Sequence, residues 1–139
     1  MKVRHQRIGF VIFAAILALI LGGFVFKYFQ ITTEARLCLR EGKNIKLALD
    51  MLTIECYGEG STVYDPKEPD GIKDSVRQQV YDITDNQGSV RLLAYDRSKR
   101  QVLQMTYEKD SYRVIYQYDE ENKDQWKVDY LVNIFDYSD

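Results

Sequence analysis

The sequence predicts an α+β protein, in which an N-terminal transmembrane helix continues into a long extracytoplasmic helix packed on a C-terminal antiparallel meander of four strands. Three observations lead to this fold. Residues 8–26 carry no charge, a helical spacing of apolar residues continues beyond them, and from Ser89 onward the apolar period changes to two. The amphipathic helix and the sheet each need a partner for their apolar face, and each is the obvious partner of the other.

The uncharged run has the length of a membrane span. As a helix, residues 8–26 extend over about 28 Å, close to the hydrocarbon thickness of a bilayer. Lys2, Arg4 and Arg7 precede the run, and Glu34 is the first acidic residue of the chain. The positive-inside rule therefore predicts a cytoplasmic N-terminus and an extracytoplasmic C-terminal domain, held in the cell membrane by a single pass.

A cleaved secretory signal is the alternative for this segment. Such signals have a shorter apolar region, of about 7–15 residues, followed by a small-x-small cleavage site. Here Gly22 and Gly23 near the end of the run provide only a poor site. We therefore expect four parts: a cytoplasmic basic tail (1–7), a transmembrane helix (8–29), an extracytoplasmic helix (30–57), and a loop region with the antiparallel sheet (58–139).

The extracytoplasmic helix is predicted from a single apolar stripe. Small and apolar residues recur at spacings of three and four, which places them on one helical face. The members of the stripe are Ala35, Cys38, Gly42, Ile45, Leu49, Leu52 and Cys56. Gly42 followed by Asn44 is the point at which the helix could end and restart, and Gly58 and Gly60 are expected to stop it.

The segment between helix and sheet is less regular. Residues 61–71 hold both prolines of the chain and several turn formers, so they are predicted to form a loop. The next stretch, "DSVRQQVYDIT", has a capping-box pattern at Ser75 and Gln78 and also suits a strand that ends at the "DNQG" turn. The sequence leaves residues 73–84 open between helix and strand.

Four strand-like runs follow: "SVRLLAY", "QVLQMTY", "YRVIYQY" and "WKVDYLVNIF". The short polar connections between them make neighbouring strands antiparallel. Tyrosine, tryptophan and valine alternate with polar residues, so one face of the sheet is apolar and aromatic. We expect the helix–sheet contact to involve Ile45, Leu49, Leu52, Tyr116, Trp126 and Tyr130.

Charge and composition argue against several functions. All 21 acidic residues follow the span, whereas four of the 19 basic residues lie at or before Lys27, so residues 28–139 carry a net charge of about −6. Such a surface repels phosphate backbones, and we expect no nucleic-acid partner. The single histidine, His5, lies in the basic tail, and no nucleophile–base pair or metal cluster is visible, so we expect no enzyme, no cofactor and no metal.

The two cysteines, Cys38 and Cys56, share one helical face but lie about 27 Å apart along a continuous helix. A disulfide requires Cα atoms about 5.5 Å apart. The two thiols can therefore pair only if the helix reverses near Gly42. Otherwise they are small buried residues of the stripe, or one of them is a reactive thiol.

The layout resembles the type IV pilin and pseudopilin family. The shared elements are a short basic leader ending "RIG", then Phe10, an apolar helix that continues outside, and a terminal antiparallel sheet. The stretch "ALDMLTIECYGEGSTVYDP" (residues 48–66) is similar to the end of the long helix in major pseudopilins. The resemblance implies cleavage between Gly9 and Phe10 and methylation of Phe10. It also implies a glutamate at the fifth mature position, where this chain has Ala14, a departure that fits minor subunits of the family.

Two functions follow from these observations. The first is a structural or interaction protein anchored in the membrane, a minor pilin- or pseudopilin-like subunit of a secretion, competence or pilus assembly, whose partners are other helical membrane or pilin-like subunits. The second is a generic anchored envelope domain that binds a protein partner or senses a ligand and is not processed at Gly9. A continuous helix favours the first function, whereas a reversal at Gly42 favours the second.

Overall fold

The computed structural model describes residues 2–84 and 87–131, and the side chains within 8–82 and 87–131. It has two helices and four strands, and it confirms the α+β fold that the sequence predicts. The chain forms two compact units, Met1–Glu34 and Ala35–Asp139. Helix α1 (Lys2–Gly58) begins in the first unit and ends in the second. Each unit is described by itself.

The first unit consists of helix alone. Its described apolar side chains are exposed on every face of the helix. Within the described residues, α1 is the one helix that is long and apolar enough to cross a membrane. An apolar surface of this size is stable only in a lipid or protein environment, which agrees with a single-pass membrane anchor.

Helix α1 continues through Gly42, the point at which the sequence allowed a break. The glycine has a packing role. A Cβ atom at Gly42 would lie 2.9 Å from Cγ1 of Val114, a residue of the sheet. The missing side chain therefore lets the sheet approach the helix backbone closely. The helix ends at Gly58 as predicted, and the Ser61 N–H donates to the Cys56 carbonyl over a distance of 2.8 Å to close the last turn.

The second unit holds the predicted meander. Its strand order is β1-β2-β3-β4 with antiparallel neighbours, and the strands are β1 (Ser89–Asp96), β2 (Gln101–Lys109), β3 (Tyr112–Asp119) and β4 (Lys123–Tyr130). Strand β4 begins at Lys123, three residues before the predicted run, because Lys123 pairs with Asp119 and extends the hairpin. The remainder of that run, from residue 132 onward, lies outside the described residues.

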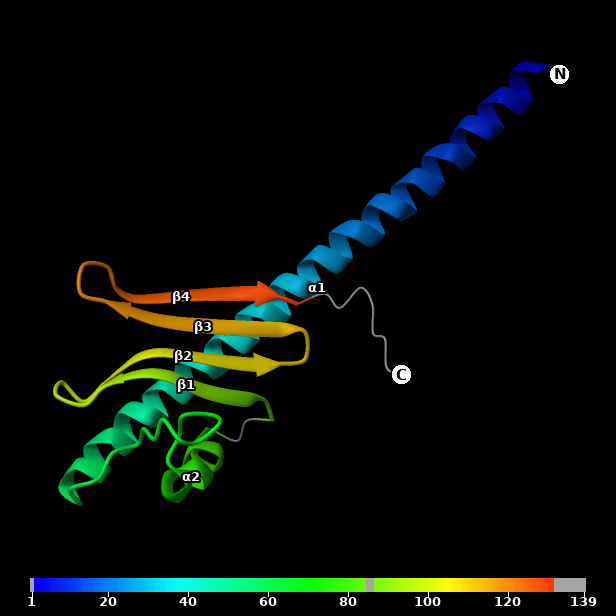
Figure 1. The fold of residues 1–139 in the computed structure, drawn as a ribbon. Coiled ribbons are helices and arrows are strands. Elements are labelled where there is room, and N and C mark those ends of the chain that lie inside the picture. The colour runs from blue at the N-terminus through cyan, green and yellow to red at the C-terminus, as the bar shows by residue number, and fades with distance from the viewer. Residues whose placement is uncertain (1, 85–86, 132–139) are drawn as a thin grey trace. The chain divides into compact units, whose positions relative to one another are not determined.

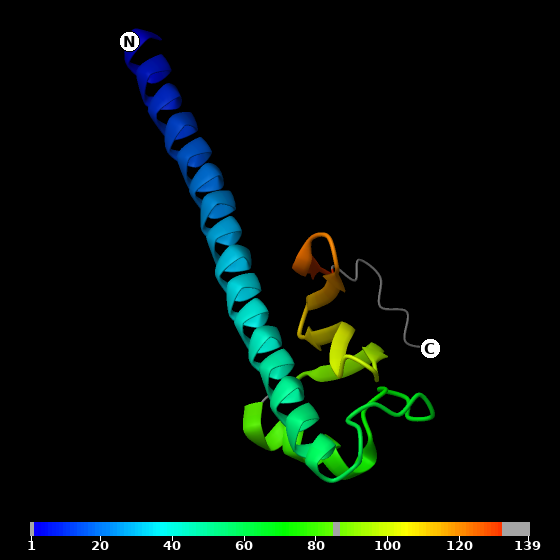
Figure 2. The ribbon, with the colours of Figure 1, turned by 90° about the vertical axis from the view of Figure 1, so that its left-hand side faces the viewer.

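One face of the sheet packs on the second half of α1 (Figures 1 and 2). The helix contributes Ile45, Leu49 and Leu52, all of which are buried. The sheet contributes large side chains from its first three strands, whose buried residues are Val90, Leu92, Val102, Met105, Tyr107, Tyr112, Val114 and Tyr116. The core of the unit is therefore the layer between α1 and the sheet.

The edge strand β4 is covered less completely. Trp126 is half-buried, and the centroid of its ring lies 4.7 Å from that of Tyr116. The Lys43 ammonium of α1 lies 5.8 Å from the centroid of the Trp126 ring. Tyr130, which we expected in the helix contact, is instead 44% exposed and packs on Tyr112 at 5.1 Å between ring centroids. An edge strand has a neighbour on one side only, so its outer residues keep contact with solvent.

The segment that the sequence left open is a helix, α2 (Asp74–Thr84). Its buried residues Val76 and Val80 lie one turn apart, and Ile72 just before it is also buried. The preceding loop is fixed to β1, because the Leu92 N–H donates to the Asp70 carbonyl at 2.7 Å. Gly71 is required at this contact, since a Cβ atom there would lie 2.0 Å from the Leu92 carbonyl oxygen.

Arg77 of α2 holds the loop in place. Its guanidinium donates to Asp70 and to Glu68, each at 2.7 Å, and to the Ile72 carbonyl at 3.0 Å. The hydrogen bonds from Arg77 keep the pKa of the Asp70 carboxyl below its ordinary value, although partial burial alone would raise it. The loop is therefore a structured part of the unit, although its sequence predicts no regular element.

Replacing Leu49 by Ala tests the helix–sheet layer. Leu49 is 0% exposed, so truncation should lower the free energy of unfolding by about 2–5 kcal/mol through lost burial and the cavity left behind. Leu47 on the same helix is 58% exposed, and Leu47→Ala should change the free energy of unfolding by less than about 0.5 kcal/mol. Urea unfolding of the full chain in an uncharged detergent measures both. Equal effects of the two variants would contradict this packing.

Candidate functional site

The residues of the predicted processing site lie in the first unit. Gly9 and Phe10 are both part of α1, and Phe10 is exposed. No side chain lies within 4 Å of the position that a Cβ atom of Gly9 would occupy. Ala14 lies one turn further along the same helix. The peptide bond between Gly9 and Phe10 is helical here, and its cleavage remains a prediction.

The two cysteines are free and buried, and they lie on one unbroken helix. The reversal at Gly42 that a disulfide between them requires is absent from α1. Burial, followed by the charge of Glu41, raises the pKa of the Cys38 thiol to about 11. Burial also raises the pKa of the Cys56 thiol. A thiol that stays protonated is a poor nucleophile, so both cysteines act here as small apolar side chains of the core.

One charged cluster links α1 to the sheet. The Glu41 carboxylate accepts a hydrogen bond from the Tyr107 hydroxyl at 2.7 Å and from the Lys109 ammonium at 2.8 Å. Burial alone would raise the pKa of Glu41, but the hydrogen bonds from Lys109 and Tyr107 outweigh it and leave that pKa below its ordinary value. We interpret this cluster as a tie between helix and sheet.

A second surface lies on the side of α1 that the sheet does not cover. Its exposed apolar residues are Leu37, Leu47, Met51 and Ile54, which we call the outer stripe. The last three recur at the helical spacings of four and three. Ile54 is 73% exposed. Exposed apolar side chains that share one face of a helix are typical of a surface that contacts another molecule. The sequence analysis named only the buried stripe and missed this one.

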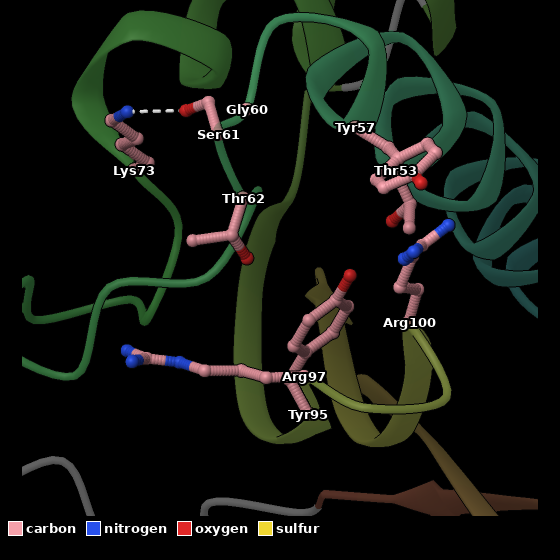
Figure 3. Close-up of a pocket in the computed structure, with 9 residues that line it drawn as sticks. All are labelled: Thr53, Tyr57, Gly60, Ser61, Thr62, Lys73, Tyr95, Arg97 and Arg100. Carbon is pink, nitrogen blue, oxygen red and sulfur yellow. Dashed lines mark hydrogen bonds between the residues drawn. The ribbon is translucent and has the colours of Figure 1, made fainter.

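A cleft of about 490 Å³ lies where the end of α1 meets the loop and the β1–β2 hairpin, and Figure 3 shows its lining. Lys73 enters from the start of α2, and Arg97 and Arg100 come from the hairpin turn. Tyr57 and Tyr95 add aromatic rings. None of the described residues that line this cleft is acidic. We call it the basic cleft.

The sequence analysis did not identify the basic cleft. Its cations are separated by more than twenty positions between Lys73 and Arg97, and no local pattern connects them. The cleft forms because the loop after α1 lies against the end of β1, where the Tyr64 and Tyr95 rings stack with centroids 6.0 Å apart. In addition, the net negative charge of the sequence gives no indication of the positive charge in this cleft.

Metal ligands are not assembled anywhere in the part of the chain that the structure describes. Within residues 2–84 and 87–131, no group of three or more histidine, cysteine, aspartate or glutamate side chains is close enough to hold a metal ion.

Comparison with known proteins finds no relative. No family model matches the chain, no curated protein matches it, and no solved structure matches it. Function must therefore be argued from the chain's own residues.

The charged tie predicts an acid-sensitive contribution to stability. Because the folded pKa of Glu41 is lowered, its contribution is complete above the unfolded pKa of about 4.3 and is lost as pH falls through the folded value. Glu41→Gln should lower the free energy of unfolding by about 1 kcal/mol at pH 7 and by less near pH 3. Glu55→Gln, an exposed change on the same helix, is the control. Urea unfolding at both pH values measures this, and a loss independent of pH would contradict it.

Proposed function

We propose that this chain is a single-pass, membrane-anchored structural protein that associates with other helical membrane subunits, in the manner of a minor pilin or pseudopilin. The observation that carries the proposal is the division of the second half of α1 into two apolar faces. One face is buried under the sheet, and the other is the exposed outer stripe. A helix that needed only to cover the sheet would require the first face alone.

The continuity of α1 supports the same proposal. The helix runs from Lys2 to Gly58 without a break at Gly42, and the two cysteines remain unpaired. Of the two functions considered from the sequence, the continuous helix favours the pilin-like one. Apolar side chains then line both the segment suited to the membrane and part of the helix beyond it, which gives a neighbouring helix a long surface to contact.

Orientation follows from the flanking charges. Lys2, Arg4 and Arg7 would keep the tail in the cytoplasm, so the unit Ala35–Asp139 would lie outside the cell membrane. Ala14 in place of a glutamate removes the carboxylate that would neutralise a neighbouring N-terminal amine within an apolar bundle. A minor subunit, present in few copies, has less need of that charge pair than the subunit of a long homopolymer.

Intact mass with N-terminal peptide mapping, on protein recovered from the membranes of its native cells, tests the processing step. The proposal predicts a mature chain that begins at Phe10, carrying one added methyl group. A chain that begins at Met1 would reject processing and favour the alternative of an anchored envelope domain that binds a protein or senses a ligand. A chain that begins beyond the apolar run would instead indicate a cleaved secretory signal.

The outer stripe predicts the contact surface. Ile54→Asp should leave the thermal unfolding temperature unchanged, because the side chain is already exposed, and should reduce chemically crosslinked complexes in the membrane severalfold. Glu55→Asp, a change at the neighbouring exposed position that keeps the charge, is the matched control. If Ile54→Asp leaves the crosslinked species unchanged, the outer stripe is not the contact surface.

A further inference from the structure

We propose that the basic cleft binds a small phosphorylated ligand, a phosphate monoester of about the size of a sugar. This inference concerns a different surface from the outer stripe and does not depend on pilin-like assembly. It rests on three features of the cleft: unpaired cations, aromatic walls, and a volume larger than a single ion requires.

The cations of the cleft lack carboxylate partners, as do about half of the other basic residues described in the same unit. Six basic residues of the unit form ion pairs: Lys46, Arg77, Lys99, Lys109, Arg113 and Lys127. Among the residues that the structure describes, Lys73, Arg97 and Arg100 form none. Asp50 lines the adjoining hollow beside Arg100 and is bonded to Lys46 at 2.6 Å. Three positive charges without a carboxylate partner thus line one cleft of a unit that carries a net negative charge.

Figure 3 shows Lys73 and Arg100 on opposite sides of the cleft, with Thr62 between them. Lys73 lies on one side, where its ammonium donates to the Ser61 hydroxyl at 2.5 Å. Arg100 lies on the other side, with its guanidinium carbon 3.2 Å from the centroid of the Tyr57 ring. The Tyr95 hydroxyl points into the space between them. The stacking on Tyr57 holds the Arg100 guanidinium in place before a ligand arrives.

Charge and size together select the ligand class. A phosphate monoester carries about −1.5 to −2 charges at pH 7 and offers three acceptor oxygens, which suits several separate cationic donors better than a carboxylate does. The cleft of about 490 Å³ falls within the range of small-molecule sites, so a phosphoryl group alone leaves most of it empty. The rings of Tyr57 and Tyr95 offer flat apolar surface for the remainder of the ligand.

The backbone conformation at Arg100 allows a substitution that changes the side chain and keeps the turn. Arg100 has a φ of 54°, in the left-handed region where asparagine is well tolerated, so Arg100→Asn removes the guanidinium without disturbing the turn. Lys123, the first residue of β4, has a φ of 61° and lies outside the cleft. Lys123→Asn therefore removes the same charge from the same type of backbone position, and it is the matched control.

The test is isothermal titration of the full chain, in an uncharged detergent, with glucose 6-phosphate, inorganic phosphate and glucose as probes. We expect glucose 6-phosphate to bind more tightly than inorganic phosphate, and glucose to give no heat. Arg100→Asn should weaken the binding of glucose 6-phosphate by about tenfold or more, whereas Lys123→Asn should change it by less than about twofold. Arg97→Gln, a change at an exposed side chain, should also weaken it and provides a second variant if Arg100→Asn unfolds.

Three results would overturn the proposal. Absence of heat with glucose 6-phosphate up to about 10 mM would exclude even a weak site. Equal weakening by Arg100→Asn and Lys123→Asn would show that bulk charge, not the cleft, attracts the anion. Equal affinity for inorganic phosphate and glucose 6-phosphate would show that the cleft does not recognise the sugar part of the ligand. All these measurements use isolated protein, so failure of the assembly proposal leaves them unaffected.

Discussion

The close contact between the second half of α1 and the sheet is the constraint on which the second unit depends. At Gly42 the helix has no side chain, and Val114 of the central strand β3 fills the space that a Cβ atom would need. This approach brings Ile45 and Leu49 of the next turns onto the sheet and buries both completely. Each buried side chain of this size contributes about 1.5–3 kcal/mol, so a few of them rival the net stability of a small domain. The Glu41 tie then fixes the relative position of helix and strand.

The same constraint determines what is left uncovered. A single sheet covers one side of a helix, so the outer stripe on the other side stays exposed. The loop and α2 complete the second unit at the β1 side of the sheet, where Gly71 lies against the backbone of Leu92. The basic cleft forms beside this junction, since it lies where the end of α1, the loop and the hairpin meet. Both proposed interaction surfaces are thus consequences of how the layers pack.

The sequence was most informative where one periodicity had one interpretation. The period of two predicts all four strands, because each carries alternating valine, tyrosine or leucine between polar turns. It was ambiguous at α2, where Val76 and Val80 fit a helical face but the short segment also fits a strand. It was misleading at Tyr130, since alternation places a residue on a face but does not tell how far the partner helix covers an edge strand. The basic cleft left no local signal, because its cations come from separate segments.

The sequence by itself determined the apolar span, the long helix, the four strands and the face that each presents, because these depend on local composition and spacing. Tertiary structure alone decided that α1 continues through Gly42, that Cys38 and Cys56 stay apart, and that Lys73 and Arg100 flank one cleft. The physical reason is that a glycine can either end a helix or let a neighbouring strand approach the helix backbone. The residues around Gly42 are compatible with both outcomes. The choice depends on Val114, more than seventy residues away along the chain.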